Sequence, residues 1–136
     1  MGENGSVAGQ VKLTIAYSLE ESRLCITVHS CRALASCSKD GADPYVSLLL
    51  LPDKKGASKR KTATKKRDLN PEFNERFDFE FSLEESTQRR LDLSVKNNVS
   101  FMSRERELIG KVTSALTMRT QFFAKNHQKE IADMTS

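Results

Sequence analysis

Residues 43–53 read DPYVSLLLLPD, and this stretch decides the class of fold. Its central part, residues 44–51, is apolar at almost every position, so a strand formed here would be apolar on both faces. We therefore expect this strand to lie in the interior of a sheet. Pro52-Asp53 is expected to form the turn that ends it, because both residues are frequent in turns.

Four other segments alternate apolar and polar residues with a period of two, which is typical of strands that bury one face. Turn-forming pairs at residues 40–41, 55–56 and 70–71 separate the strand segments. This density of strands predicts an all-β fold, an antiparallel β-sandwich. A short helix over residues 116–125, before a last strand near residues 128–134, is the one expected departure. The alternating apolar positions are Val11, Leu13, Ile15 and Tyr17; Leu24, Ile26 and Val28; Phe77, Phe79 and Phe81; and Leu91, Leu93 and Val95.

Size and composition indicate a single domain. The chain has 136 residues, of which 38% are hydrophobic and 29% charged, as is usual for a globular protein with one core. We expect this domain over residues 10–136, after a polar, glycine-rich linker of residues 1–9. No apolar run is long enough to span a membrane, and the first residues do not resemble a signal peptide. The odd number of cysteines predicts reduced thiols in the cytosol: Cys25, Cys31 and Cys37.

Positive charge is concentrated in one segment. Residues 54–67, here called the basic strip, contain eight lysines and arginines and no acid. The net charge of the chain is +4, so the remaining residues carry −4, the difference between +4 and +8. Such a segment is typical of a polyanion-binding surface, although lysines on an edge strand can also serve only to prevent aggregation. The eight residues are Lys54, Lys55, Lys59, Arg60, Lys61, Lys65, Lys66 and Arg67.

Five short motifs follow one another in an order typical of a known family: DPYV at 43–46, LLPDK at 50–54, KT at 61–62, LNPEFNE at 69–75 and LIG at 108–110. Over residues 10–134 the chain resembles a C2 domain of the synaptotagmin topology. This resemblance implies an eight-stranded antiparallel β-sandwich. More narrowly, residues 43–53, 71–77 and 100–112 resemble the C-terminal C2 domain of an extended synaptotagmin.

The narrower resemblance implies a cellular context. Extended synaptotagmins are anchored in the endoplasmic reticulum, reach the plasma membrane with C2 domains and transfer lipid with a separate domain. The resemblance therefore implies a non-enzymatic membrane-targeting module on the cytoplasmic face of membranes, at contacts between the endoplasmic reticulum and the plasma membrane. Its partners would be anionic membrane lipids and the other C2 domains of the parent protein.

The resemblance also indicates which positions would have to hold the ligands of a calcium ion. In the family, two loops supply about five carboxylates to calcium, a hard cation that prefers oxygen ligands. The matching positions here hold only two acids, so we expect no strong calcium binding, no cofactor and a structural role for the aspartate. Those positions are Cys37, Asp43, Asn97, Val99 and Glu107.

The basic strip is then the predicted phospholipid-binding site. In the family, lysines at the positions of Lys59 and Lys61 lie on the concave face of a sheet and contact phosphoinositide headgroups, beside an aromatic residue at the position of Tyr45. Two further family lysine positions fall on other residues here, and Lys96 is expected to compensate for them. The predicted site therefore comprises Tyr45, Lys96 and the whole basic strip.

A strand over residues 59–67 would divide these side chains between two faces. One face would carry Lys59, Lys61, Lys65 and Arg67, and the other would carry Arg60, Thr62, Thr64 and Lys66.

Functions of other classes are less well supported. An enzyme is not expected, since the two histidines, His29 and His127, lie apart from any nucleophile pattern, and Cys31 and Cys37 are expected to be merely exposed. Nucleic acid is not expected, because the basic strip lacks interleaved aromatic residues and a recognition helix. An acidic protein segment that binds the same basic strip stays open as an alternative.

Overall fold

The computed structural model describes residues 7–36, 41–99, 107–116 and 128–135. It confirms the all-β fold with eight strands. The elements are β1 (Val7–Ser18), β2 (Arg23–Arg32), β3 (Pro44–Leu51), β4 (Arg60–Lys61), β5 (Glu72–Phe79), α1 (Leu83–Thr87), β6 (Arg90–Asn97), β7 (Leu108–Ala115) and β8 (Gln128–Thr135). No helix in the described residues has the length and apolar character needed to span a membrane.

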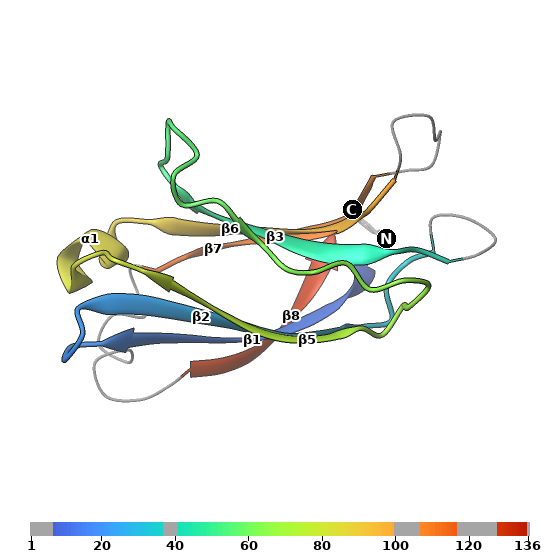
Figure 1. Cartoon of the computed structure of the whole chain (residues 1–136), viewed down its shortest axis with the longest axis horizontal. Coiled ribbons are helices and arrows are strands. Elements are labelled where there is room, and N and C mark those ends of the chain that lie inside the picture. The colour runs from blue at the N-terminus through green and yellow to red at the C-terminus, as the bar shows by residue number, and fades with distance from the viewer. Residues whose placement is uncertain (1–6, 37–40, 100–106, 117–127, 136) are drawn as a thin grey trace, which may run out of the picture.

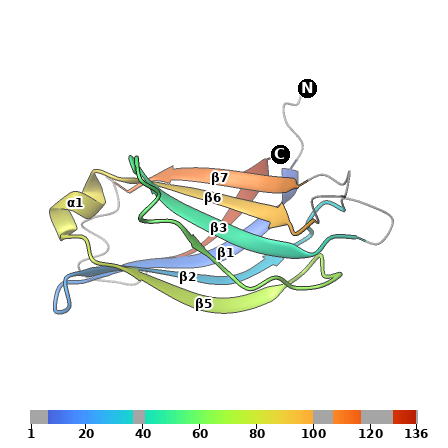
Figure 2. The same cartoon turned by 45° about the horizontal axis from the view of Figure 1, so that its top comes forward.

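The strands form two layers that face each other (Figures 1 and 2). All pairings are antiparallel, in the order β4-β3-β6-β7-β8-β1-β2-β5. The two layers, β4-β3-β6-β7 and β8-β1-β2-β5, are joined at one corner by the single pair Lys111 and Thr135. As expected, β3 is an interior strand, with β4 on one side and β6 on the other.

The core lies between the layers and follows the period-two pattern of the sequence. In β3, Val46, Leu48 and Leu50 are fully buried. They pair with Val95, Leu93 and Leu91 of β6, so a continuous apolar surface faces the opposite layer. The intervening residues of both strands lie on the outer face of the β4-β3-β6-β7 layer.

The open edge of the sandwich, between β4 and β5, is closed by two side chains. The guanidinium of Arg60 lies 4.8 Å from the ring centroid of Phe79, over the edge of the core. The Glu75 carboxylate accepts a 2.9 Å hydrogen bond from the backbone N–H of Ala63, which links β5 to the segment after β4. Both contacts connect one layer to the other.

Strand β4 is much shorter than the strand expected over residues 59–67. Only Arg60–Lys61 pairs with β3 as a ladder. Beyond it, the N–H groups of Thr62 and Lys65 still reach carbonyl oxygens of Val46 and Pro44, but the chain turns away at Arg67, whose φ is 50°. The chain forms a turn at residues 66–67, so the alternation of faces stops before residue 67.

The start of the first strand and the position of the helix also differ from what the sequence predicts. β1 begins at Val7, so the expected linker of residues 1–9 overlaps this strand by three residues. Helix α1 was not expected, although Ser82 caps it by accepting a 3.0 Å hydrogen bond from the N–H of Glu85. The serine with a glutamate three positions later is a helix-start signal in the sequence. Of the helix expected over residues 116–125, only Leu116 is described, as a buried non-helical residue.

The last strand provides a test of the core. Met134 is fully buried, whereas Ile131 of the same strand is 59% exposed. We expect Met134→Ala to lower the free energy of unfolding by about 2–5 kcal/mol, because it leaves a cavity in the core. Ile131→Ala is the matched control and should stay within about 0.5 kcal/mol of wild type. Chemical denaturation measures both, and equal losses would contradict the assignment of Met134 to the core.

Candidate functional site

The register of four strands brings two lysines and two serines into one row. Lys61 of β4 pairs with Ser47 of β3, Ser47 pairs with Ser94 of β6, and Ser94 pairs with Lys111 of β7. Paired residues share a face, and this row lies on the outer face of its layer. Neighbouring strands are spaced at about 4.8 Å, so the two lysine Cα atoms lie roughly 14 Å apart across the serines. The row therefore has two serines in its middle, the buried Ser47 and the half-buried Ser94, and a lysine at each end.

A second pair extends this row toward the loop end of the sheet. Tyr45 of β3 pairs with Lys96 of β6, two residues along each strand from the serines. Both side chains are partly exposed. In the other direction the row is bounded by an acid, because Asp92 pairs with Leu49 on the same face. We call the six residues of the two rows the basic face: Tyr45, Ser47, Lys61, Ser94, Lys96 and Lys111.

The lysines of the basic face make no ion pair with another described residue. The ion pairs in the described part of the chain involve Arg23, Arg76 and Arg89. Lys61 and Lys111 are exposed and Lys96 is half-buried. Their charges are therefore available to a ligand outside the protein.

The rest of the basic strip does not form one surface with the basic face. Lys54, Lys55 and Lys59 belong to the loop of residues 52–59 that joins β3 to β4, here called the hairpin loop. Lys65, Lys66 and Arg67 follow β4 at the opposite end of β3, and Arg60 is directed at Phe79 instead of the outer face. The structure thus divides the predicted site into a hairpin group, a basic-face group and a loop group.

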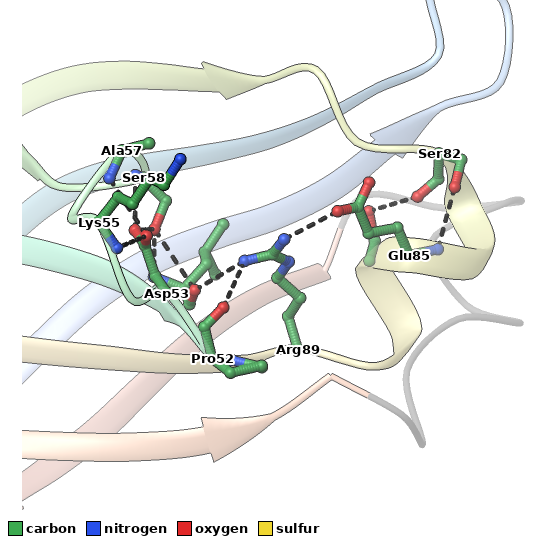
Figure 3. Close-up of polar contacts among 10 residues, drawn as sticks. Pro52, Asp53, Lys55, Ala57, Ser58, Ser82, Glu85 and Arg89 are labelled. Atoms are coloured by element: carbon green, nitrogen blue, oxygen red, sulfur yellow. Dashed lines mark hydrogen bonds and ion pairs between the residues drawn. The ribbon is translucent and has the colours of Figure 1, made fainter.

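The hairpin loop is held by the carboxylate of Asp53 (Figure 3). This carboxylate accepts hydrogen bonds from the backbone N–H groups of Lys55, Ala57 and Ser58, at 3.3, 3.2 and 2.7 Å, and from the hydroxyl of Ser58. The Ser58 hydroxyl also contacts the backbone of Leu50, so the loop is bonded to the end of β3. These donors, the Ser58 hydroxyl first among them, lower the pKa of Asp53 from 3.8 to about 2.

Arg89 fixes the base of the same loop (Figure 3). Its guanidinium donates to the carbonyl oxygens of Leu50 and Pro52 at 3.1 and 2.8 Å, and to the Glu85 carboxylate of α1 at 2.8 Å. It also lies 4.2 Å from the ring centroid of Phe81. The partners of the Arg89 guanidinium are groups of the hairpin base, of α1 and of Phe81. Arg89 therefore has a structural role, because it anchors the hairpin loop to α1.

Two of the residues at the family calcium positions named above, Asp43 and Asn97, make hydrogen bonds within the chain. The side-chain oxygen of Asn97 accepts a 2.8 Å bond from the backbone N–H of Asp43, and Asn97 is only 3% exposed. The Asp43 carboxylate in turn accepts a 2.9 Å bond from the N–H of Arg67. Asp43 therefore joins the start of β3 to the loop group.

The other described residues at the family calcium positions do not form a cluster of carboxylates with Asp43. Val99 is half-buried, Glu107 is exposed and Cys37 lies outside the described residues. The backbone carbonyl of Glu107 accepts a 2.6 Å hydrogen bond from the N–H of Asn97. In the part of the chain that the structure describes, no three histidine, cysteine, aspartate or glutamate residues are grouped as metal ligands would be.

The cysteines differ in part from expectation. Cys31 was expected to be exposed, but it is buried in the core, and burial raises the pKa of its thiol to about 12. Its place follows from the bulge between Val28 and Ser30, which shifts the alternation of β2. Cys25 is also buried, and burial followed by the neighbouring Asp78 raises the pKa of its thiol. Neither thiol is poised as a nucleophile.

The sheet order and the strand register define the class of protein. The chain belongs to the C2 domain family, whose model matches residues 22–132. This match confirms the resemblance expected from the sequence motifs, and the C2 domain is a non-enzymatic module.

Within this class the chain is similar to the extended synaptotagmins. It is 64% identical over 104 residues to extended synaptotagmin-1 of Pongo abelii, with 76% of this chain and 9% of the relative covered. It is 47% identical over 119 residues to extended synaptotagmin-2 of Homo sapiens, with 84% and 13% covered. The chain therefore spans about a tenth of the length of these relatives.

A solved structure gives the same result. The solution structure of the third C2 domain of KIAA1228 protein superposes with a TM-score of 0.88 and 43% sequence identity. The superposition covers 100% of this chain and 94% of that one. This likeness extends over the whole sandwich described above.

Sequence reasoning missed several residues of the site. Ser94 joins the basic face through the pairing of β6 with β3, and Lys111 joins it through the pairing of β6 with β7, and no local pattern reveals either pairing. Strict alternation would have placed Lys111 on the same face as the buried Ile109, and the register shift between β6 and β7 places it on the outer face instead. Asp53 and Arg89 were missed because their partners lie in other elements or in irregular backbone.

The ionisation of Asp53 gives a testable prediction. Because its pKa is lower in the folded chain, its contribution to stability is complete above pH about 4 and is lost as the pH falls through about 2. Ser58→Ala removes the first cause of this shift, so we expect the pKa of Asp53 to rise toward 3.8. Titration of the carboxyl carbon by NMR measures it, and a pKa that remains near 2 in the variant would refute the assignment.

A second prediction concerns the calcium position. Asn97→Ala should lower the free energy of unfolding by about 1–3 kcal/mol, because it leaves the N–H of Asp43 without its buried acceptor. The loss should be the same with calcium or with a chelator in thermal and chemical unfolding. A wild-type domain that calcium stabilises, together with a variant that calcium does not stabilise, would instead identify Asn97 as a metal ligand.

Proposed function

We propose that this C2 domain binds anionic phospholipids, phosphoinositides in particular, through the basic face and without calcium. The observation that carries the proposal is the row Lys61–Ser47–Ser94–Lys111 with Lys96 beside it. Ammonium groups at both ends and hydroxyl groups between them suit a headgroup that carries more than one phosphate. Tyr45 would bound this site on the side of the loop group.

The energy expected of this surface is modest. Each lysine near an anionic leaflet contributes about 1 kcal/mol. The three lysines of the basic face would give roughly 3 kcal/mol, or millimolar affinity on the 1 M scale. Such an affinity suits a module that acts beside others on one chain, where tethering raises the effective concentration.

Independence from calcium follows from the hydrogen bonds around Asp43. The Asn97 oxygen already accepts a bond from the backbone, and one Asp43 oxygen accepts a bond from Arg67. Calcium would have to displace these bonds and would gain few charged ligands in exchange. The basic face, by contrast, needs no metal to attract an anionic surface.

The parent protein would use this module as a membrane contact. The chain spans about a tenth of the extended synaptotagmins that it resembles, so it would act together with other domains. We propose a role on the cytoplasmic side of contacts between the endoplasmic reticulum and the plasma membrane, in a protein that tethers membranes and transfers lipid.

Cosedimentation with liposomes tests the proposal. Binding to vesicles that contain phosphatidylinositol bisphosphate should be equal with calcium and with a chelator and should weaken with salt. Lys61→Ala/Lys111→Ala should weaken binding by roughly 30-fold, from about 1 kcal/mol per lysine. Lys12→Ala, on the opposite layer, is the control and should bind as wild type does.

Two outcomes would overturn the proposal. Binding that requires calcium would reject the basic face as the main contact. Failure to bind any anionic liposome, combined with tight binding of an acidic peptide, would favour the protein-interaction alternative that uses the same lysines.

A further inference from the structure

The hairpin loop is more ordered and more exposed than a simple connection between two strands requires. Lys54, Lys55, Ala57 and Lys59 are all exposed around Gly56. A Cβ added at Gly56 would meet nothing within 4 Å, so the tip projects into solvent. Figure 1 shows this green loop rising from the β4-β3-β6-β7 layer on the side away from the other layer. That side carries the basic face.

The loop is nevertheless fixed. Four donors of the loop are bonded to the Asp53 carboxylate, and the N–H of Lys59 donates to the carbonyl of Gly56 at 3.1 Å. Arg89 bonds the carbonyl of Pro52 at the loop's base and the Glu85 carboxylate of α1. Loops of this length usually lose much conformational entropy when they bind, and this one has lost it already.

The charge of the tip is directed outward. Asp53 is the one acid in the loop, and its carboxylate faces the N–H groups inside the loop. Lys54, Lys55 and Lys59 make no ion pair with any residue in the described ranges. A projecting tip with outward lysines cannot enclose a single phosphate, but it suits the diffuse negative charge of a flat leaflet.

We propose that the hairpin loop is a second, preorganised contact with the same anionic leaflet that the basic face binds, and that Asp53 is its positioning residue. This inference rests on the proposed function. From Tyr45 to the end of β3 at Leu51 the strand advances about 20 Å, which separates the two contacts along the membrane plane. Two rigid contacts at that separation fix the tilt of the domain, with the β4-β3-β6-β7 layer toward the lipid.

A substitution at Asp53 distinguishes the effect of charge on membrane binding from the effect of loop conformation. Asp53→Ala removes a negative charge, so attraction to an anionic leaflet alone predicts tighter binding than wild type. Loss of the four loop hydrogen bonds instead predicts weaker binding, because Lys54 and Lys55 must then be ordered on the membrane. Glu20→Ala, in the exposed turn between β1 and β2, makes the same change in charge and is the matched control.

The test uses the 136-residue chain and phosphatidylcholine vesicles in which phosphatidylserine is the one anionic lipid. Lys54→Ala and Lys55→Ala should each weaken binding about fivefold, while Lys12→Ala should not. Asp53→Ala should bind more weakly than wild type, and Glu20→Ala as tightly or more tightly. Soluble inositol trisphosphate, measured by calorimetry, should bind all of these variants equally, which also shows that they are folded.

The outcomes distinguish this inference from the proposed function. If Lys54→Ala and Lys55→Ala behave as Lys12→Ala does, while Lys61→Ala/Lys111→Ala still weakens binding, the hairpin contact is rejected and the basic face is retained. If Asp53→Ala tightens binding as much as Glu20→Ala does, the positioning role of Asp53 is rejected. If Lys61→Ala/Lys111→Ala changes neither vesicle nor inositol trisphosphate binding, the proposed function itself is rejected.

Discussion

The pairing register of β3 with β6 is the constraint on which the rest of this structure depends. Val46, Leu48 and Leu50 must lie beside their partners Val95, Leu93 and Leu91 on the inner face of one layer, because all six side chains are buried in the core. A slip of one residue would exchange the two faces of a strand. Such a slip in β3 would bury Tyr45, a slip in β6 would bury Lys96, and either would expose leucines of the core. The positions of the cations are therefore set by the packing of apolar residues on the other side of the same sheet.

The sequence predicts the strands well for a physical reason. Each strand buries one face, so alternation of apolar residues marks it, and Leu13, Ile26 and Leu93 lie in the core as that pattern indicates. Pairing between strands has no such local signal. The outward place of Lys111 beside Ser94 comes from the register of β7 with β6, because Ile109, two residues before Lys111, is buried. The division of the basic strip depends likewise on a turn at Arg67, whose left-handed backbone no residue type in that segment announces.

At both ends of β3, an aspartate side chain orders the adjoining loop by the same kind of hydrogen bond. At each end an aspartate beside β3 accepts backbone N–H groups from irregular chain: Asp43 from Arg67, and Asp53 from residues of the hairpin loop. Such bonds satisfy donors that have no strand partner. An aspartate at a family calcium position thus also accepts a hydrogen bond from the backbone. Spacing in the sequence does not reveal this hydrogen bond, because Arg67 is 24 residues away from Asp43.

The contacts that close the edge between β4 and β5 bear on how several such domains can share one polypeptide. Unprotected strand edges recruit strands from other molecules, and neighbouring sandwiches on a tether meet often. With Arg60 lying over Phe79 and Glu75 bonded to Ala63, that side offers charged and occupied groups in place of a free ladder. Several domains of this kind on one polypeptide can then come close to one another while remaining separately folded, because strands do not pair between them at this edge.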